Sequence, residues 1–346
     1  MLLSVIMPAY NDGNYMDKAI SSVYGQTFQD FELIVVNDGS TDQTDRVCRK
    51  WQSKHPNFVY ITQENRGPSV ARAVGIQAAR GKYCMFLDAD DWFCAKDAFE
   101  RLVNRMEERG VDVLQFLVEK NKFGKSGSVS GTSGEKSIEE FWSQDCSTLL
   151  GGETKDISPY ICDKIYRTDI FKAVVTDHKV ERICIFDYIY LNLLFFARSE
   201  VKRMAWEPWL CYSWRQYSGA IFRCDESLLE DYEVLKALQL ATIEKMGLPK
   251  SYLKQCHVET AYLFGSACWK AGQHRKVTVD LLKQLYQYPM VQGAITYFEE
   301  NPGGLWDVIW NFMNTGEEKL ARDAARYSKN WKAKGKGLYI SLFCKK

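Results

Sequence analysis

The chain has 346 residues, which is long enough for one large domain or two smaller ones with a substantial core. A hydrophobic fraction of 46% and a charged fraction of 26% are ordinary for a soluble globular protein. The net charge is +1, so no global field favours nucleic acid or a membrane, and we expect no nucleic-acid partner. The 11 cysteines are scattered without a Cys-x-x-Cys pair, which argues against a zinc site and a disulfide framework.

The cysteines and the first residues of the chain predict a cytoplasmic protein. Residues 2–7 form an apolar run that is too short for a signal peptide and has no basic residues before it. Unpaired cysteines suit a reducing compartment. No stretch approaches the roughly 20 apolar residues that a membrane span needs.

In the first ninety residues, short apolar runs alternate with amphipathic segments. The runs are residues 2–7, 31–36, 58–62 and 83–87, and the amphipathic segments are residues 15–24, 42–54 and 69–80. Strands that alternate with helices predict βαβ units and a largely parallel sheet with flanking helices. In such sheets, ligands bind at the carboxyl ends of the strands.

Polar residues follow all four apolar runs. One such turn has an ordinary explanation, because Ser40 or Thr41 can cap the next helix. Four successive turns of this kind favour a ligand-binding edge. They are Pro8-Ala9-Tyr10-Asn11-Asp12, Asn37-Asp38-Gly39-Ser40, Gln63-Glu64-Asn65-Arg66-Gly67 and Asp88-Ala89-Asp90-Asp91.

The last of these turns places three carboxylates, Asp88, Asp90 and Asp91, within four residues. They repel one another unless a cation lies between them. Mg²⁺ and Mn²⁺ suit oxygen ligands and usually bind through one or two carboxylates together with a substrate phosphate. A solvated acidic turn is the alternative.

Two common nucleotide-binding motifs are missing. The first run is not followed by Gly-x-Gly-x-x-Gly, and the chain has no Gly-Lys-[Ser/Thr] loop, which disfavours a dinucleotide site and a P-loop. A nucleotide at this edge would be held by carboxylates and a metal, with Arg66 and Arg72 near its base or phosphates.

Five motifs in order resemble the nucleotide-sugar-binding half of inverting glycosyltransferases of family 2, which have the GT-A fold. The resemblance is greatest to the branch that makes bacterial capsules and surface polysaccharides. The matching stretches are residues 5–11, 26–27 with 35–42, 64–67, 71–72 and 86–92. One departure is Ala73, where the family often has asparagine, and this puts one polar contact of the pocket in doubt.

The resemblance implies a donor pocket and a metal site. Asp88 and Asp90 match the Asp-x-Asp motif, with Asp90 binding Mn²⁺ or Mg²⁺ at the diphosphate and Asp88 reaching the ribose side and, as a second candidate, the metal. Ala9 and Asp38 match positions that contact uridine. The donor pocket would comprise Pro8, Ala9, Tyr10, Asn11, Asp38, Arg66, Gly67, Arg72, Asp88 and Ala89.

Asp187 opens a helical pattern in the second half of the matching region. An acid in the first turn is stabilised by the helix dipole, which explains the residue without any catalytic role. The family has Glu-Asp at this point, and its aspartate is the catalytic base. Phe186 replaces the glutamate here, so the resemblance implies a base at Asp187 alone.

Between these regions, the pattern predicts a helix from Asp97 that Gly110 ends, and then a strand over residues 111–118. Residues 121–134 are rich in Gly, Ser and Lys and predict either a plain loop or a mobile hairpin or lid. Ser137 and Glu140 suit a capping box.

An aromatic stretch over residues 206–217 lines either the acceptor site or the core. Together with Asp91, its Trp214 and Arg215 and the following Ser218 are candidates for contact with the acceptor or the diphosphate.

We predict three parts: a donor-binding half over residues 1–115, an acceptor-side half with the base over residues 116–224, and a mostly helical region over residues 225–346. The basic and aromatic tail, residues 329–346, suits either contact with an anionic membrane from the cytoplasmic side or a frayed terminus.

The predicted function is metal-dependent, inverting transfer of a sugar from a nucleotide-diphosphate donor, such as a UDP-sugar, to a hydroxyl of a glycan or lipid-linked glycan. A catalytically silent nucleotide-sugar-binding module is one alternative, and the loss of glutamate at position 186 is its only support. A sugar nucleotidyltransferase is the other, but the loop after the first run lacks the Gly, Lys and Arg that hold a triphosphate.

Overall fold

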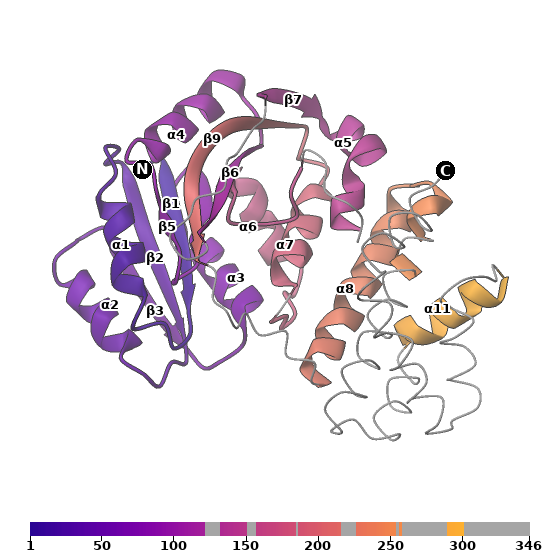
Figure 1. The fold of residues 1–346 in the computed structure, drawn as a ribbon, viewed down its shortest axis with the longest axis horizontal. Helices are drawn as coiled ribbons and strands as arrows, with labels where there is room; N and C mark the ends of the chain where they lie inside the picture. Colours follow the sequence, from indigo (N-terminus) through magenta and orange to yellow (C-terminus); the bar gives the residue numbers. More distant parts are fainter. Residues whose placement is uncertain are drawn as a thin grey trace. The chain divides into compact units, whose positions relative to one another are not determined.

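The structure, a computed structural model, describes residues 1–121, 132–150, 157–184, 186–215, 226–253, 256–257 and 289–300. The chain divides into two compact units, Met1–Phe222 and Arg223–Lys346 (Figure 1). The candidate site lies in the first unit.

The first unit is built on one nine-stranded sheet with the order β3-β2-β1-β4-β8-β6-β9-β5, and β7 pairs with β9. The strands are β1 (Leu3–Ala9), β2 (Phe31–Asp38), β3 (Phe58–Gln63), β4 (Tyr83–Phe86), β5 (Trp92–Phe93), β6 (Val113–Asn121), β7 (Gly134–Ser137), β8 (Lys164–Arg167) and β9 (Arg203–Arg215).

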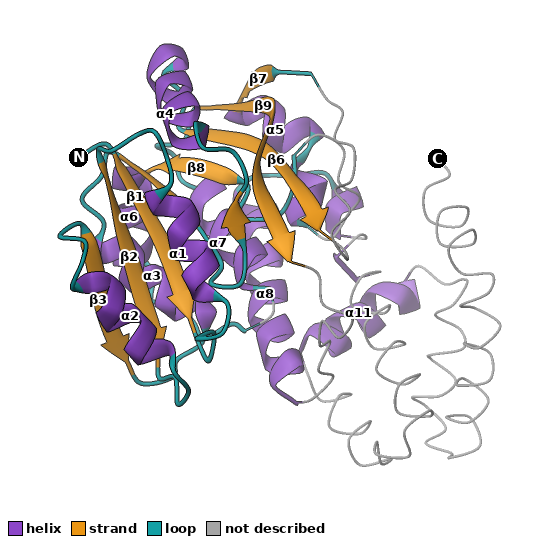
Figure 2. Ribbon diagram, turned by 60° about the vertical axis from the view of Figure 1, so that its left-hand side comes forward, coloured by secondary structure: helices purple, strands orange, loops and turns teal. Residues whose placement is uncertain are grey.

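Helices cover both faces of this sheet (Figures 1 and 2). They are α1 (Met16–Tyr24), α2 (Thr44–Gln52), α3 (Pro68–Ala78), α4 (Ala98–Arg109), α5 (Ile138–Gln144), α6 (Thr168–Asp177) and α7 (Asp187–Phe196), with a short 3₁₀ helix, η1 (Cys146–Leu149). An α/β fold with the sheet between two helical layers is therefore confirmed.

Strands β3, β2, β1 and β4 pair in parallel, so their carboxyl ends meet at one edge of the sheet, as the arrowheads of β1 to β3 in Figure 2 show. β8 then pairs antiparallel with both β4 and β6. The sheet is thus parallel where the donor edge was predicted and mixed beyond it. β5, β7 and β8 are too short to give a clear hydrophobic period.

The two faces of β1 pack against different helices. Leu3, Val5 and Met7 join a buried cluster with residues of α1, α2 and α4. On the opposite face, Gly75 of α3 lies so close to Ile6 that an added Cβ would come within 2.4 Å of the Ile6 Cγ2. Gly75 therefore sets how closely α3, which carries Arg72, approaches the sheet.

Two local predictions are confirmed. Gly110 ends α4 in the left-handed conformation, with φ of 58°. Ser137 and Glu140 form a reciprocal capping box at the start of α5.

Several predictions fall outside the described residues. They concern Ser218, most of the loop over residues 121–134 and the tail over residues 329–346. The eight cysteines that the described ranges contain are free thiols.

The second unit contains α8 (Glu226–Lys245) and α11 (Pro289–Glu300), which pack together. The Met290 amide donates to Glu233 Oε2 at 3.1 Å.

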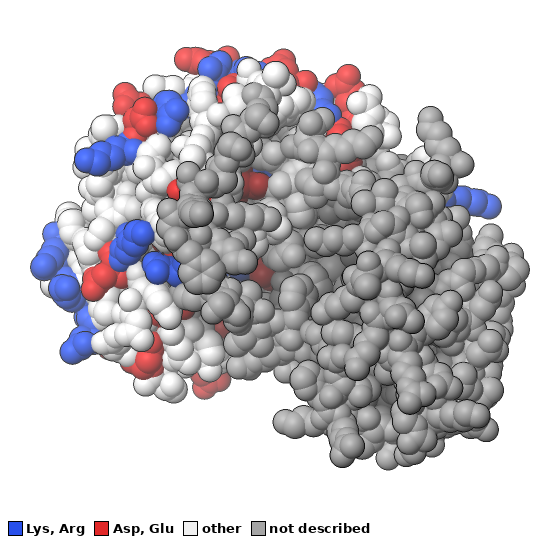
Figure 3. Space-filling model, in the orientation of Figure 1, with Lys and Arg blue, Asp and Glu red and all other residues white. Residues whose placement is uncertain are grey.

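Within the described ranges, none of the helices has both the length and the apolar character that crossing a bilayer requires. On the face shown in Figure 3, Lys and Arg mix with Asp and Glu over the described surface, and neither sign gathers into a large patch.

Candidate active site

The loops after β1 and β2 interlock at the carboxyl edge of the sheet. Asn11 adopts a left-handed conformation with φ of 60°, which asparagine tolerates better than most residues. Its side-chain Oδ1 accepts from the Thr41 amide at 2.9 Å, and its own amide donates to Ser40 Oγ at 3.0 Å. The Asp12 amide donates to Thr44 Oγ1 at 3.1 Å. These bonds join the two loops to each other.

Asp38, at the end of β2, anchors the loop that follows β3. Its carboxylate accepts from Gln63 Nε2 at 2.6 Å and from the amides of Arg66 and Gly67, both at 2.8 Å. Gly67 has φ of 84°, where a side chain would be strained, and it precedes α3 directly. Asp38 thus positions the start of α3. Its predicted contact with uridine stays a prediction.

Asp91 connects the acidic turn to β9. The side chain is buried, accepts from Tyr212 Oη at 2.7 Å, and accepts from the Arg215 amide at 2.7 Å. Tyr212 Oη in turn accepts from the Asp88 amide at 3.1 Å. Because both carboxylate oxygens are engaged by β9, Asp91 serves as a structural tie between the turn and the strand.

Asp90 lies in an acidic, poorly solvated environment. Burial raises its pKa to about 7, with further contributions from the charges of Asp88 and Asp12. Burial likewise raises the pKa of Asp12 to about 6, and Asp88 adds to the shift. Three carboxylates that repel one another in this way would be relieved by a cation.

The residues present fit a divalent ion that is completed by its substrate. In the described part of the chain, no group of three or more His, Cys, Asp or Glu side chains is arranged to hold a metal by itself. Mg²⁺ and Mn²⁺ commonly bind through one or two carboxylates plus substrate phosphates. Asp90 and Asp88 would supply the protein ligands in such a site.

Arg72 bridges the acidic turn and the predicted base. Its Nη2 donates to Asp88 Oδ1 at 2.5 Å, and its Nη1 forms a short contact with Asp187 Oδ2. The side chain is buried, and burial lowers its pKa, but Asp187 and Asp88 outweigh that effect and leave the pKa above its ordinary value. The Nε is also buried and has no hydrogen-bond partner among the described residues.

Asp187 is the first residue of α7 and is itself buried. Burial raises its pKa to about 6, whereas Arg72 and the backbone amides of residues 187 and 188 lower it. The carboxyl group is therefore poised to gain or lose a proton near neutral pH, as a general base requires.

The segment before Asp187 is fastened to the start of α3. Ser69 Oγ donates to the Glu181 carbonyl at 2.7 Å and accepts from the Ile183 amide at 2.8 Å. Ser69 thereby ties the segment before the base to the helix that carries Arg72.

Arg215, at the end of β9, is held over the acidic turn. Its Nε donates to the Asp90 carbonyl at 2.7 Å. The guanidinium carbon lies 5.2 Å from the ring centroids of both Tyr15 and Trp92. A cation so placed suits a diphosphate beside Asp90.

The structure brings most predicted site residues to one edge. Ala9 and Ala89 are buried there, Tyr10 and Arg66 are exposed, and Pro8 is half-buried. Sequence reasoning missed the electrostatic role of Asp12, although the residue stands directly after the first motif. It also missed Ser69, whose role depends on contacts more than 100 residues away in sequence. For the aromatic stretch that contains Tyr212 it left the acceptor site and the core open, and Tyr212 is a buried core residue bonded to Asp91.

This fold, a mixed sheet whose parallel strands end near the turn of Asp88 and Asp90, resembles the GT-A fold of glycosyltransferases. Residues 4–165 match the model of "Glycosyl transferase family 2". The match covers slightly less than half of the chain.

Curated relatives agree with this assignment. The chain is 39% identical over 111 residues to "Glycosyltransferase GlyA" of Streptococcus pneumoniae, which covers 32% of this chain and 16% of the relative. It is 34% identical over 179 residues to "Minor teichoic acid biosynthesis protein GgaB" of Bacillus subtilis, which covers 50% of this chain and 19% of the relative. The chain thus spans less than a fifth of each of these relatives.

Among solved structures, S. aureus TarS residues 1–349 in complex with UDP superposes with a TM-score of 0.64 at 19% identity, covering 95% of this chain and 92% of that one. A complex of the same protein with UDP-GlcNAc gives 0.55 at 16% identity, covering 95% and 92%. At these identities the likeness shows a common fold.

Proposed function

We propose that this protein transfers a sugar from a UDP-sugar to a hydroxyl of a glycan or lipid-linked glycan, with inversion at the anomeric carbon, in the synthesis of a surface polysaccharide. The observation that carries the proposal is the bridge from Asp88 through Arg72 to Asp187. It places a carboxylate with a raised pKa beside the Asp-x-Asp turn that would hold the donor.

In this reaction Asp187 accepts the proton of the acceptor hydroxyl. The hydroxyl oxygen forms a bond to the anomeric carbon as the bond from that carbon to the diphosphate oxygen breaks. Attack from the face opposite the leaving group inverts the configuration. Arg72 keeps Asp187 ionised and oriented while the proton is still on the acceptor.

Asp90 and Asp88 would hold the divalent ion. When bound, Mn²⁺ or Mg²⁺ supplies positive charge to the departing diphosphate. Arg215, fixed by Tyr15, Trp92 and the Asp90 carbonyl, would add a second positive charge on that side.

The relatives and structural neighbours support the choice of substrates. The neighbouring TarS structures contain UDP and UDP-GlcNAc, which favours a UDP-sugar here. GgaB is named for teichoic acid biosynthesis, which favours a surface-polymer acceptor.

The test is release of UDP from UDP-glucose, UDP-galactose, UDP-GlcNAc and UDP-GalNAc with Mn²⁺ present. We expect one donor to be hydrolysed slowly without an acceptor, and excess EDTA to stop the release. Asp187→Asn should bind UDP as the wild type does but release it from the donor far more slowly. A wild-type protein that binds none of the four donors contradicts the proposal.

A catalytically silent donor-binding module is the alternative that Phe186 favours, because the family's glutamate is missing there. It predicts UDP-sugar binding with Mn²⁺ but no UDP release above that of Asp187→Asn. The same assay therefore separates the two.

A further inference from the structure

Two aromatic side chains pack against Tyr160, and one of them directly follows Asp187 in sequence. The ring centroid of Tyr160 lies 5.4 Å from that of Tyr188 and 5.4 Å from that of Trp214. All three residues are half-buried. They come from the turn before β8, the first turn of α7 and the end of β9, which are distant in sequence.

These rings, here called the aromatic wall, are joined through the chain to residues of the proposed reaction centre. Tyr188 directly follows the base. Trp214 directly precedes Arg215, which is bonded to the acidic turn. The turn of Tyr160 also contains Cys162, whose pKa is raised by burial and, to a smaller extent, by the charge of Asp88.

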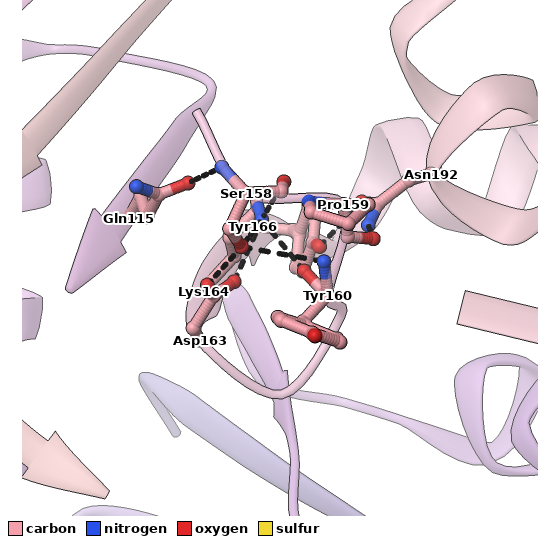
Figure 4. A network of polar contacts seen from close by, with 8 residues as sticks. All are labelled: Gln115, Ser158, Pro159, Tyr160, Asp163, Lys164, Tyr166 and Asn192. Atoms are coloured by element: carbon pink, nitrogen blue, oxygen red, sulfur yellow. Dashed lines mark hydrogen bonds and ion pairs between the residues drawn. The ribbon is translucent and has the colours of Figure 1, made fainter. Parts of the chain in front are cut away.

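The turn that carries Tyr160 is held by a buried lysine (Figure 4). Lys164 Nζ donates to the Tyr160 carbonyl at 2.6 Å, to the Ser158 carbonyl at 2.8 Å and to Asp163 Oδ1 at 2.6 Å. The Pro159 carbonyl accepts from Asn192 Nδ2 of α7 at 2.8 Å. The turn is thus fixed to the helix whose first residues are Asp187 and Tyr188.

A fully buried ammonium group is an expensive way to stabilise a core. Burial lowers the pKa of Lys164, and the opposing effect of the Asp163 charge is too small to restore its ordinary value. A buried ion pair of this kind is often no more stabilising than apolar residues of similar volume, so its value lies in the geometry that it imposes. Here Lys164 fixes the carbonyls of Ser158 and Tyr160, on either side of Pro159. It thereby also positions the Tyr160 ring.

We propose that Tyr160, Tyr188 and Trp214 bind the apolar face of a pyranose ring in the acceptor, and that Lys164 is a positioning residue for this subsite. A pyranose presents C–H groups on its faces and hydroxyls at its rim. Aromatic rings that carry hydroxyl or N–H groups can cover such a face and still bond its rim. The inference rests on the proposed function, because the pyranose bound to the aromatic wall would be the sugar whose hydroxyl faces Asp187.

The test uses methyl pyranosides of glucose, galactose, GlcNAc and GalNAc, in both anomers, as probes with the full chain, UDP and Mn²⁺. Saturation-transfer NMR should detect binding of at least one pyranoside to the wild type, with the strongest transfer to C–H hydrogens of one ring face. Tyr160→Leu and Trp214→Leu remove a ring but keep an apolar side chain. We expect each to weaken that affinity at least tenfold, with UDP affinity changed less than twofold.

Trp209→Leu is the matched control, because Trp209 lies on the same strand but contacts Arg101 and Arg105 of α4. It should bind the pyranoside as the wild type does. For the positioning role, Lys164→Met should raise the acceptor KM while UDP affinity is kept. Ser158→Ala, which removes one Lys164 contact at 3.2 Å, should show a smaller change of the same kind if Lys164→Met does not fold.

Two outcomes overturn the inference alone. One is UDP binding by the wild type without binding of any pyranoside, and the other is wild-type pyranoside affinity in both leucine variants. A wild-type protein that does not bind UDP overturns the proposed function and this inference with it.

Discussion

Arg72 forms ion pairs with two aspartates that are 99 residues apart in sequence, Asp88 of the acidic turn and Asp187 at the start of α7. It reaches both because Gly75, one turn further along α3, lets the helix lie against β1. One buried guanidinium thus connects the two halves of the proposed site, and its charge acts directly on the base.

The first prediction concerns the pH dependence. The pKa of Asp187 is raised to about 6 by burial, and Arg72 opposes that shift. UDP release by the wild type should therefore decline as the pH falls through about 6, where the base gains its proton. In Arg72→Met the opposing charge is gone, so the acid limb should move to higher pH by about one unit or more.

The measurement is the initial rate of UDP release between pH 5 and 9. Arg72→Lys is the control, because it keeps a positive charge and should leave the limb closer to its wild-type position. An acid limb that Arg72→Met leaves in place would show that Asp187 is not the group that titrates.

The second prediction concerns Asp187 itself. Asp187→Asn keeps the shape of the side chain but cannot accept a proton, so sugar transfer should fall by about 10²- to 10⁴-fold. Asp169 is a matched control, because it also lies in the first turn of a helix and pairs with an arginine, Arg167, but on exposed surface. Asp169→Asn should retain transfer within about twofold.

The third prediction concerns the metal. The pKa of Asp90 is raised to about 7 and that of Asp12 to about 6, so the folded state favours the protonated form of each carboxyl group. Their contribution to stability is complete below the unfolded pKa near 3.8 and is lost as the pH rises through 6 to 7. Mn²⁺ should replace the lost protons, so it should raise Tm more at pH 8 than at pH 5.5.

Thermal unfolding at the two pH values, with Mn²⁺ or with EDTA, measures this difference. UDP should be present in both series, since a phosphate is expected to complete the site. Asp90→Asn should abolish the increment from Mn²⁺. An equal increment in wild type and Asp90→Asn would place the metal elsewhere.

The parallel half of the fold could be predicted because its signals are local. Four apolar runs of four to eight residues, each followed by turn residues, mark β1 to β4 and the edge where they end. The donor-side residues lie within those turns, so their order along the chain already indicated that they meet. The Asp-x-Asp turn and the capping of α5 are of the same local kind.

The acceptor side could not be predicted in this way. β8 is inserted between β4 and β6, although it lies about 50 residues after β6 begins. From the sequence, Lys164 of β8 would be expected at the surface, but it is fully buried. Pairings such as Arg72 with Asp187 or Tyr212 with Asp91 join residues more than 100 positions apart, and no local period encodes them.

The last prediction concerns Tyr212, whose hydroxyl joins β9 to the acidic turn. It donates to Asp91 Oδ2 and accepts from the Asp88 amide, and the residue is fully buried. Tyr212→Phe leaves both partners without that bond, which should cost about 1–3 kcal/mol of unfolding free energy. For a unit of this size, each kcal/mol lowers Tm by about 2–4 °C.

Thermal unfolding followed by circular dichroism would measure the change. Tyr10→Phe is the control, because Tyr10 is 51% exposed and loss of its hydroxyl should leave Tm unchanged. Because the turn also carries Asp90, the Tm increment from Mn²⁺ with UDP should shrink in Tyr212→Phe as well. A Tyr212→Phe protein with wild-type Tm and a wild-type response to Mn²⁺ would contradict the view that β9 positions the acidic turn.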